Sequence, residues 1–505
     1  MTDTGDHGSA GRSLAGLAIS GALFVIMLLT PPPEALSVAG WRVAAVAVVM
    51  AVLWMTEALP IPATALIPIA AFPILGIAPV GKAAAPYANP IIFLFLGGFI
   101  VALTMERWQL HTRIALAVLS RAGNRADALI AAFMGVTAFL SMWVSNTATA
   151  LMMVPIALSV TALLRPEDPA GSDPGTTQLL RRFAPALLLS VAYGASIGGL
   201  GTLVGTPPNA FLAAFMLEQF GLRIGFAEWM ALGLPVVVVM LCVTWWLLTH
   251  VIFRLGGKSI AAAGQSVSAQ ARAQGPLTRA QKLAAALFLV TAGLWITRPL
   301  IAQATGLTAL DDTVIAVAAA LAAFVIPVDM RQGRFLMDWD TARRLPWGVL
   351  LLFGGGLALA DAIAASGLAG WIGGRLTIFA DLPPVVTVLA VVALVIFLTE
   401  LTSNTATTAT FLPVLATLAL AIGENPLLLA VPAALAASCA FMLPVATPPN
   451  AIVFGSGHLS VPQMARAGLL VNLAGIALIT TLAYLLLPLV FGLEPGRVPD
   501  WAKMP

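Results

Sequence analysis

The chain has 505 residues, of which 60% are apolar and only 9% are charged. Soluble domains carry about 25% charged and about 45–50% apolar residues, so this composition excludes a soluble protein of this length. The formal net charge of +3 is too small to indicate a nucleic-acid partner. One helical crossing of a bilayer needs about 20 apolar residues. The composition therefore predicts an integral, multi-pass membrane protein whose fold is all-α.

Hydropathy, together with the Gly, Pro and charged residues that interrupt the apolar runs, predicts eleven membrane-spanning helices in chain order. They lie near residues 13–30, 41–59, 62–79, 89–108, 180–219, 228–253, 280–303, 312–328, 345–366, 427–455 and 463–492. Most of the 25 lysines and arginines fall on inside loops if the N-terminus is cytoplasmic, as the positive-inside rule requires. Residues 1–12 are then a cytoplasmic tail, and residues 493–505 are an external tail.

Two further apolar segments, 127–164 and 384–421, are too long for one span and are interrupted by polar residues. Each half has roughly 13–17 residues, which is too short to cross the bilayer core at about 1.5 Å per residue. We therefore expect two re-entrant hairpins, each turning at a Ser-Asn-Thr sequence.

The same motifs occur twice along the chain. Ser145-Asn-Thr-Ala-Thr recurs at Ser403, 258 residues later, and Thr206-Pro-Pro-Asn-Ala recurs at Thr447, 241 residues later. Three paired motifs in one order, including an echo of Phe95-Leu-Gly-Gly, are not expected by chance. They predict an internal repeat.

The polar segment 254–279 divides the chain into a first repeat, 13–253, and a second repeat, 280–492. We expect this segment to be a flexible cytoplasmic linker. The predicted spans give the two repeats opposite directions in the membrane, which is the inverted-repeat architecture of secondary transporters. The first hairpin then enters from the cytoplasm and the second from outside.

Broken helices in a membrane need a chemical reason, because lipid cannot satisfy the freed backbone groups. The paired prolines of each Thr-Pro-Pro-Asn motif remove two backbone donors and stop a helix. Free carbonyls and Ser, Thr and Asn oxygens suit a hard cation such as Na⁺, whereas helix N-termini attract an anion. Two hairpin tips and two unwound helices could therefore form one ion and anion site.

These motifs, together with Trp54-Met-Thr-Glu-Ala-Leu-Pro, resemble the divalent anion:sodium symporter family, the sodium-coupled dicarboxylate, citrate and sulfate cotransporters. The resemblance covers roughly residues 13–492. It implies import of a C4-type dicarboxylate (succinate, malate or fumarate) coupled to Na⁺, by a homodimer with an elevator-like motion. We expect the protein in the cytoplasmic membrane of a bacterium.

The resemblance also implies the residues of each site. The first sodium site is expected at the side-chain or backbone oxygens of Ser141, Ser145, Asn146 and Gly205. The second is expected at Thr399, Thr402, Asn404 and Ala446. The substrate carboxylates are expected at Asn146, Thr147, Thr206, Pro207, Asn404, Thr405, Thr447 and Pro448.

Other functions stay open at this point. The same fold could exchange dicarboxylates without sodium or carry another divalent anion, such as sulfate or citrate. Neither hairpin tip contains Lys, Arg or His, which favours the sodium-coupled branch. An enzyme is not expected, since the sequence has no His-Glu-x-x-His motif and no redox cysteine pair. A channel would need a continuous pore, and the broken helices favour alternating access instead.

Single polar residues also allow a structural interpretation. Isolated Ser, Thr and Asn in membrane helices more often hydrogen-bond neighbouring helices than bind ligands, and it is their repetition at matched positions that favours a site. Glu57 and Glu400 are intramembrane acids. Glu57 could equally cap a helix end. Glu400 lies between two expected ligands but could face away from them, so it is left outside the site.

Overall fold

The computed structural model describes residues 6–503, apart from 163–173, 256–267, 308 and 378–380. It is helical except for one short antiparallel hairpin within this described part. Seven of the described helices are long and apolar enough to cross a membrane. This agrees with the composition: the protein is an integral, multi-pass membrane protein.

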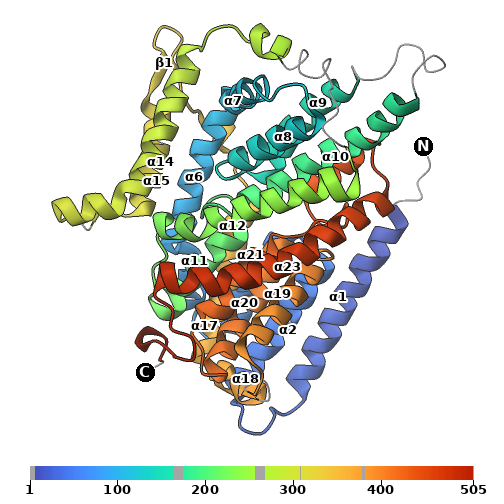
Figure 1. Ribbon diagram of the computed structural model, residues 1–505. Coiled ribbons are helices and arrows are strands. Elements are labelled where there is room, and N and C mark those ends of the chain that lie inside the picture. Colours follow the sequence, from blue (N-terminus) through green and yellow to red (C-terminus); the bar gives the residue numbers. More distant parts are fainter. Residues whose placement is uncertain (1–5, 163–173, 256–267, 308, 378–380, 504–505) are drawn as a thin grey trace.

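The first half of the chain forms helices up to residue 252 (Figure 1). They are α1 (Asp6–Leu29), α2 (Val38–Thr56), α3 (Ile61–Thr64), α4 (Ile67–Ile74), α5 (Val80–Ala84), the short 3₁₀ turn η1 (Ala85–Ala88), α6 (Pro90–Arg107), α7 (Leu110–Leu119), α8 (Ala126–Ser141), α9 (Asn146–Ala162), α10 (Pro174–Gly199), α11 (Pro207–Phe220), α12 (Phe226–Trp246) and the π-helix η2 (Leu247–Ile252).

The second half follows the segment 254–279, much of which lies outside the described residues. Its elements are α14 (Arg279–Thr305), α15 (Asp312–Val325), β1 (Pro327–Asp329), β2 (Arg334–Phe335), α16 (Trp339–Ala342), α17 (Trp347–Ala365), α18 (Leu368–Leu376), α19 (Pro384–Thr399), α20 (Asn404–Ala421), α21 (Leu427–Ala437), α22 (Pro448–Gly455), α23 (Val461–Phe491) and the 3₁₀ turn η4 (Asp500–Ala502).

Some expected boundaries differ from the structure. α1 begins at Asp6, inside the segment expected to be a tail. The expected span 62–79 is divided into α3 and α4, because prolines interrupt its hydrogen bonding. The expected span 312–328 ends as a helix at Val325, where the chain enters the β1–β2 hairpin.

The two halves repeat the same helices at the same spacing. α8 and α9 are matched by α19 and α20, each of which begins 258 residues later. α11 is matched by α22, which begins 241 residues later. Even an unusual backbone conformation recurs: Gln109 before α7 and Gly367 before α18 both have left-handed φ angles, of 51° and 80°. The repeated motifs of the sequence therefore correspond to repeated local structure.

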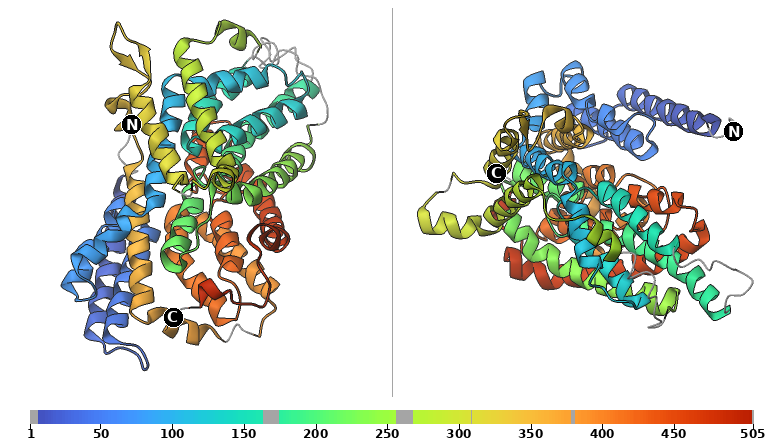
Figure 2. Two further views of the ribbon diagram at one scale, coloured as in Figure 1. Left: turned by 90° about the vertical axis from the view of Figure 1, so that its left-hand side faces the viewer. Right: turned by 90° about the horizontal axis from the view of Figure 1, so that it is seen from above.

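The two helical hairpins lie in different halves of the molecule (Figures 1 and 2). α8 and α9 are near the top of Figure 1, and α19 and α20 are in its lower part. The side view in Figure 2 keeps the same order. α10 and α12 run between them, while α1 and α2 form one flank. The hairpin tips, at residues 142–145 and 400–403, both contribute residues to one cavity.

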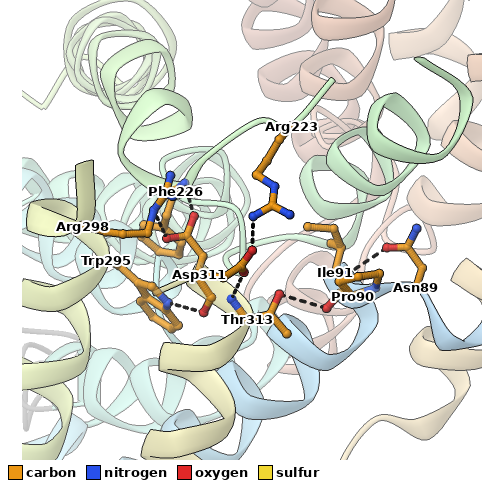
Figure 3. A network of polar contacts seen from close by, with 10 residues as sticks. Asn89, Pro90, Ile91, Arg223, Phe226, Trp295, Arg298, Asp311 and Thr313 are labelled. Carbon is orange, nitrogen blue, oxygen red and sulfur yellow. Dashed lines mark hydrogen bonds and ion pairs between the residues drawn. The ribbon is translucent and has the colours of Figure 1, made fainter. Parts of the chain in front are cut away.

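A buried acid joins three helices of the fold, and Figure 3 labels its partners Phe226, Trp295 and Arg298. Asp312, at the start of α15, forms an ion pair with Arg298 of α14, with Nε and Oδ1 2.8 Å apart. Its other carboxylate oxygen accepts from the backbone N–H of Phe226 at 2.9 Å, which holds the start of α12. The Trp295 indole donates to its backbone carbonyl at 3.0 Å. This network fixes α12, α14 and α15 relative to one another.

α8 and α10 pack backbone to backbone, which only glycine permits. A Cβ on Gly194 would lie 2.8 Å from the carbonyl oxygen of Met134, and one on Gly198 would lie closer still to that of Ala138. We expect Gly198→Ala to destabilise the protein by about 1–3 kcal/mol, measured as a lower unfolding temperature in detergent. Gly135→Ala is the control, since a Cβ there meets nothing within 4 Å. Equal unfolding temperatures for the two variants would contradict this packing.

Candidate functional site

A cavity of about 1210 Å³ lies where the two hairpin tips meet the two interrupted helices. The sequence-predicted site residues that line it are Ser145, Asn146, Thr147, Gly205, Thr206, Pro207, Thr402, Asn404, Thr405, Ala446, Thr447 and Pro448. The cavity extends toward α1, α2 and α6, where Glu57 and Glu106 line it, and Arg344 contributes the one cationic side chain among its lining residues. Residues about 250 positions apart in the sequence thus share one concave surface.

Two predicted residues, Ser141 and Thr399, do not line the cavity. Each is the last residue of its helix, fully buried, and directly behind a tip asparagine. The Ser141 hydroxyl lies 2.6 Å from the Asn146 side-chain amide, and the Thr399 hydroxyl lies 2.7 Å from that of Asn404. Both pairs have the same spacing of five residues. These hydroxyls therefore act on the cavity through the two asparagines.

The Asn146 amide is surrounded by oxygen atoms. The amide atom beside Ser141 also lies 3.2 Å from the Gly205 carbonyl oxygen and 3.3 Å from that of Ala195. These three oxygens come from three segments: α8, α10 and the residues before α11. The amide satisfies them by turning its nitrogen toward them. A hard cation could bind these same oxygens if the amide were turned the other way, so that its own oxygen also faced the cation. Ala195 is an addition that the motifs could not suggest, since it contributes only its backbone.

The second tip has a related arrangement. The Thr399 hydroxyl lies 2.9 Å from the carbonyl oxygen of Ala437 at the end of α21, in addition to its contact with Asn404. The Thr402 hydroxyl lies 2.6 Å from that of Thr407 and 3.0 Å from the Leu398 carbonyl oxygen. Hydroxyl and carbonyl oxygens therefore gather around each hairpin tip.

The two interruptions, residues 200–206 and 438–447, are each held by the asparagine of the Pro-Pro-Asn motif. The side-chain amide nitrogen of Asn209 lies 3.1, 3.3 and 2.8 Å from the carbonyl oxygens of residues 199, 200 and 202. That of Asn450 lies 3.1 and 3.0 Å from those of residues 440 and 443. Both side chains are fully buried. Sequence reasoning assigned them no role, although their recurrence within the motif was the available signal.

Four helices begin at the cavity: α9 at Asn146, α20 at Asn404, α11 at Pro207 and α22 at Pro448. Each helix N-terminus carries about half a positive charge. α9 and α20 begin with residues that have N–H groups, whereas α11 and α22 begin with two prolines, which have none. No cationic side chain from the tips or the interruptions lines the cavity. The arrangement therefore favours an anion at the centre through backbone dipoles, while the carbonyl ends of α8, α10, α19 and α21 offer oxygens to cations.

The two intramembrane acids, Glu57 and Glu400, differ in whether they face the cavity. Glu57 ends α2 in a left-handed conformation (φ 50°) and lines the cavity. Glu400 is buried, does not line the cavity, and binds backbone N–H groups of the second interruption.

The family model of the sodium:sulfate symporter transmembrane region matches residues 12–493 of this chain. The sodium-dependent dicarboxylate transporter SdcS of Staphylococcus aureus strain USA300 is 42% identical over 488 residues, which cover 96% of this chain and 93% of the relative. The protein of the same name in the bovine strain RF122 / ET3-1 is 43% identical with the same coverage.

Solved structures with a similar fold are much more distant in sequence. The Alcanivorax borkumensis YdaH transporter has a TM-score of 0.59 and 15% identity, covering 81% of this chain and 88% of its own. Neisseria gonorrhoeae MtrF has a TM-score of 0.58 and 13% identity, covering 97% of both chains. At this identity they show the fold alone. The family match and the close relatives together show that the chain belongs to the sodium:sulfate symporter transmembrane region family.

Proposed function

We propose that this protein is a secondary active transporter that imports a C4-type dicarboxylate, such as succinate, malate or fumarate, together with Na⁺. One observation carries the proposal: four helix N-termini and two clusters of oxygen ligands meet in one cavity to which the tips and interruptions contribute no cationic side chain. The name of the 42–43% identical relatives supports both sodium and a dicarboxylate.

Each repeat provides one of the two proposed sodium sites. The first sodium ion is proposed at Ser141, Ser145, Asn146 and Gly205, and the second at Thr399, Thr402, Asn404 and Ala446. The dicarboxylate is proposed between them, at Asn146, Thr147, Thr206, Pro207, Asn404, Thr405, Thr447 and Pro448. All of these residues line the cavity except Ser141 and Thr399, which contact the two tip asparagines.

Sodium coupling follows from charge. A dicarboxylate carries two negative charges, whereas a helix N-terminus supplies only about half a positive charge. Desolvating an uncompensated dianion is very costly, so cations must enter with it. Each bound sodium ion should then raise the affinity for the anion, and the anion should raise the affinity for sodium to the same degree.

For the architecture, we propose eleven spans and two re-entrant hairpins in an inverted repeat, with the N-terminus in the cytoplasm. The opposite placement of the α8–α9 and α19–α20 hairpins supports this arrangement. An elevator-like movement of the hairpins and interrupted helices, within a homodimer in the bacterial cytoplasmic membrane, completes the proposal.

We expect succinate uptake into proteoliposomes to require a sodium gradient. The measurement replaces NaCl by choline chloride at constant ionic strength and pH, with unlabelled malate, fumarate, citrate and sulfate as competitors. Undiminished uptake in choline would overturn sodium symport and favour an exchanger. Strong competition by sulfate with no competition by malate would instead place sulfate as the substrate, in keeping with the family description.

The threonine hydroxyls of the tips should bind the carboxylates. Thr147→Val and Thr405→Val keep the side-chain volume and remove one hydroxyl each. A hydrogen bond to a charged group is worth about 1.5–3 kcal/mol, so the apparent affinity for succinate should fall about 10- to 150-fold. Thr417→Val is the control, because this residue lies further along α20, away from the cavity lining, and its hydroxyl donates to the Pro413 carbonyl oxygen. Unchanged affinity in both tip variants would exclude the tips as the anion site.

A further inference from the structure

Glu400 follows Thr399, the last residue of α19, yet its carboxylate points away from the cavity. It is only 3% exposed and does not line the cavity. Its Oε1 accepts from the backbone N–H of Phe441 at 2.7 Å and of Met442 at 2.9 Å, and its Oε2 accepts from that of Leu443 at 3.0 Å. One side chain of the hairpin therefore binds three consecutive N–H groups of the second interruption.

A fourth donor completes the arrangement. The side-chain amide of Asn472, on α23, donates to the Glu400 Oε1 at 2.8 Å and is itself fully buried. No ion pair within the described part of the chain includes Glu400. The carboxylate is thus balanced by four neutral donors alone. Removing it would leave these donors unpaired in a buried place, which is costly.

In the first repeat, the corresponding backbone N–H groups of the interruption are paired without a charged side chain. Met142 stands at the matching position, directly after the last residue of the first helix of its hairpin. In the first interruption the N–H groups of Leu200 and Gly201 donate to backbone carbonyls three residues earlier, at 3.1 and 2.9 Å. Within the described residues, only the second interruption is bound by an acidic side chain, that of Glu400 in the hairpin of its own repeat. The repeat is therefore symmetric in its motifs and asymmetric in its charge.

The geometry points to Glu400 as a positioning residue for the second sodium site. By fixing residues 441–443, the carboxylate sets where the following residues, Ala446 and Thr447, stand relative to the hairpin tip at Asn404. The inference rests on the proposed function and deepens it, because it makes the two sodium sites unequal. The second site depends on a buried negative charge, and the first does not.

The consequence is measurable in Glu400→Gln. The amide keeps the size of the side chain, but its NH₂ group faces a backbone N–H and the charge is lost. Losing a charged hydrogen bond and a nearby negative charge should weaken sodium binding at the second site. We expect the sodium concentration that gives half of the stabilisation to rise by at least about tenfold.

A binding measurement without transport tests this. Purified protein in choline chloride is titrated with NaCl in the absence of substrate, and the unfolding temperature is recorded at each concentration. The matched control is Glu424→Gln, because Glu424 is also 3% exposed and its Oε2 accepts from a backbone N–H, that of Gly496, at 2.9 Å. The control should lower the starting unfolding temperature and leave the half-saturating sodium concentration unchanged.

The outcomes separate the two proposals. If sodium does not stabilise the wild-type protein, the proposed function is wrong and this inference fails with it. If sodium stabilises wild type and Glu400→Gln at the same concentrations, the inference alone is wrong. Should Glu400→Gln not fold, Asn472→Leu carries the test, since it keeps the charge and removes one of its four donors. Its half-saturating sodium concentration must also rise, and an unchanged value would overturn the inference.

Discussion

Asn146→Ala is expected to weaken the binding of sodium and of the dicarboxylate together. The Asn146 amide lies against the oxygens of Ser141, Gly205 and Ala195 and also lines the cavity at the first residue of α9. Asn404→Ala should have the same effect in the second repeat, where the amide contacts Thr399. Losing a polar ligand of a charged group costs about 1.5–3 kcal/mol. Each half-saturating concentration should therefore rise about 10- to 150-fold.

The measurement is a two-dimensional titration of succinate uptake against sodium and succinate for both variants. Asn425→Ala is the control, because Asn425 is a buried asparagine whose side chain accepts from the backbone N–H of Leu427, away from the cavity. An increase in only one of the two concentrations, in both variants, would mean that the tip asparagines bind one species and not the other.

The hairpins were predictable because their signals are local. Pro384 begins α19, Thr399 ends it, and Asn404 begins α20, as the polar interruption in the apolar run predicts. The expected span 62–79 is not one continuous helix, because hydropathy alone does not weigh prolines spaced closely enough to end one helix and begin the next. Apolar composition establishes that a segment is buried in the membrane, not that it is one helix.

The supporting contacts of the site could not be predicted from the sequence. Glu400 lies between two expected ligands, but its partners are the N–H groups of residues 441–443 and the amide of Asn472. Backbone donors carry no sequence signature, so nothing in the motif indicates where the carboxylate points. The motifs therefore predict which residues face the ligand, while the residues that hold those segments in place become visible only in three dimensions.

Among these supporting contacts, we expect the largest loss of stability when Asn209 is replaced. Its amide nitrogen lies within 3.3 Å of three carbonyl oxygens of the first interruption, and leaving buried carbonyls unpaired costs about 1–3 kcal/mol each. An NH₂ group has two hydrogens, so Asn209→Leu removes the equivalent of two such hydrogen bonds and should lose roughly 2–6 kcal/mol, a large part of the stability of a typical protein. Asn450→Leu should lose a similar amount, since the Asn450 amide donates to two carbonyl oxygens.

Asn209→Asp separates the hydrogen bonds from the packing. It keeps the shape of the side chain but replaces the donating NH₂ by an oxygen that faces carbonyl oxygens. We expect it to be as damaging as Asn209→Leu, with a strongly lowered unfolding temperature in detergent and no succinate uptake. Asn425→Ala, which removes a single cap bond, should be much milder. A wild-type unfolding temperature in Asn209→Asp would show that the first interruption does not depend on this amide, because packing alone would then hold residues 200–206 in their unwound form.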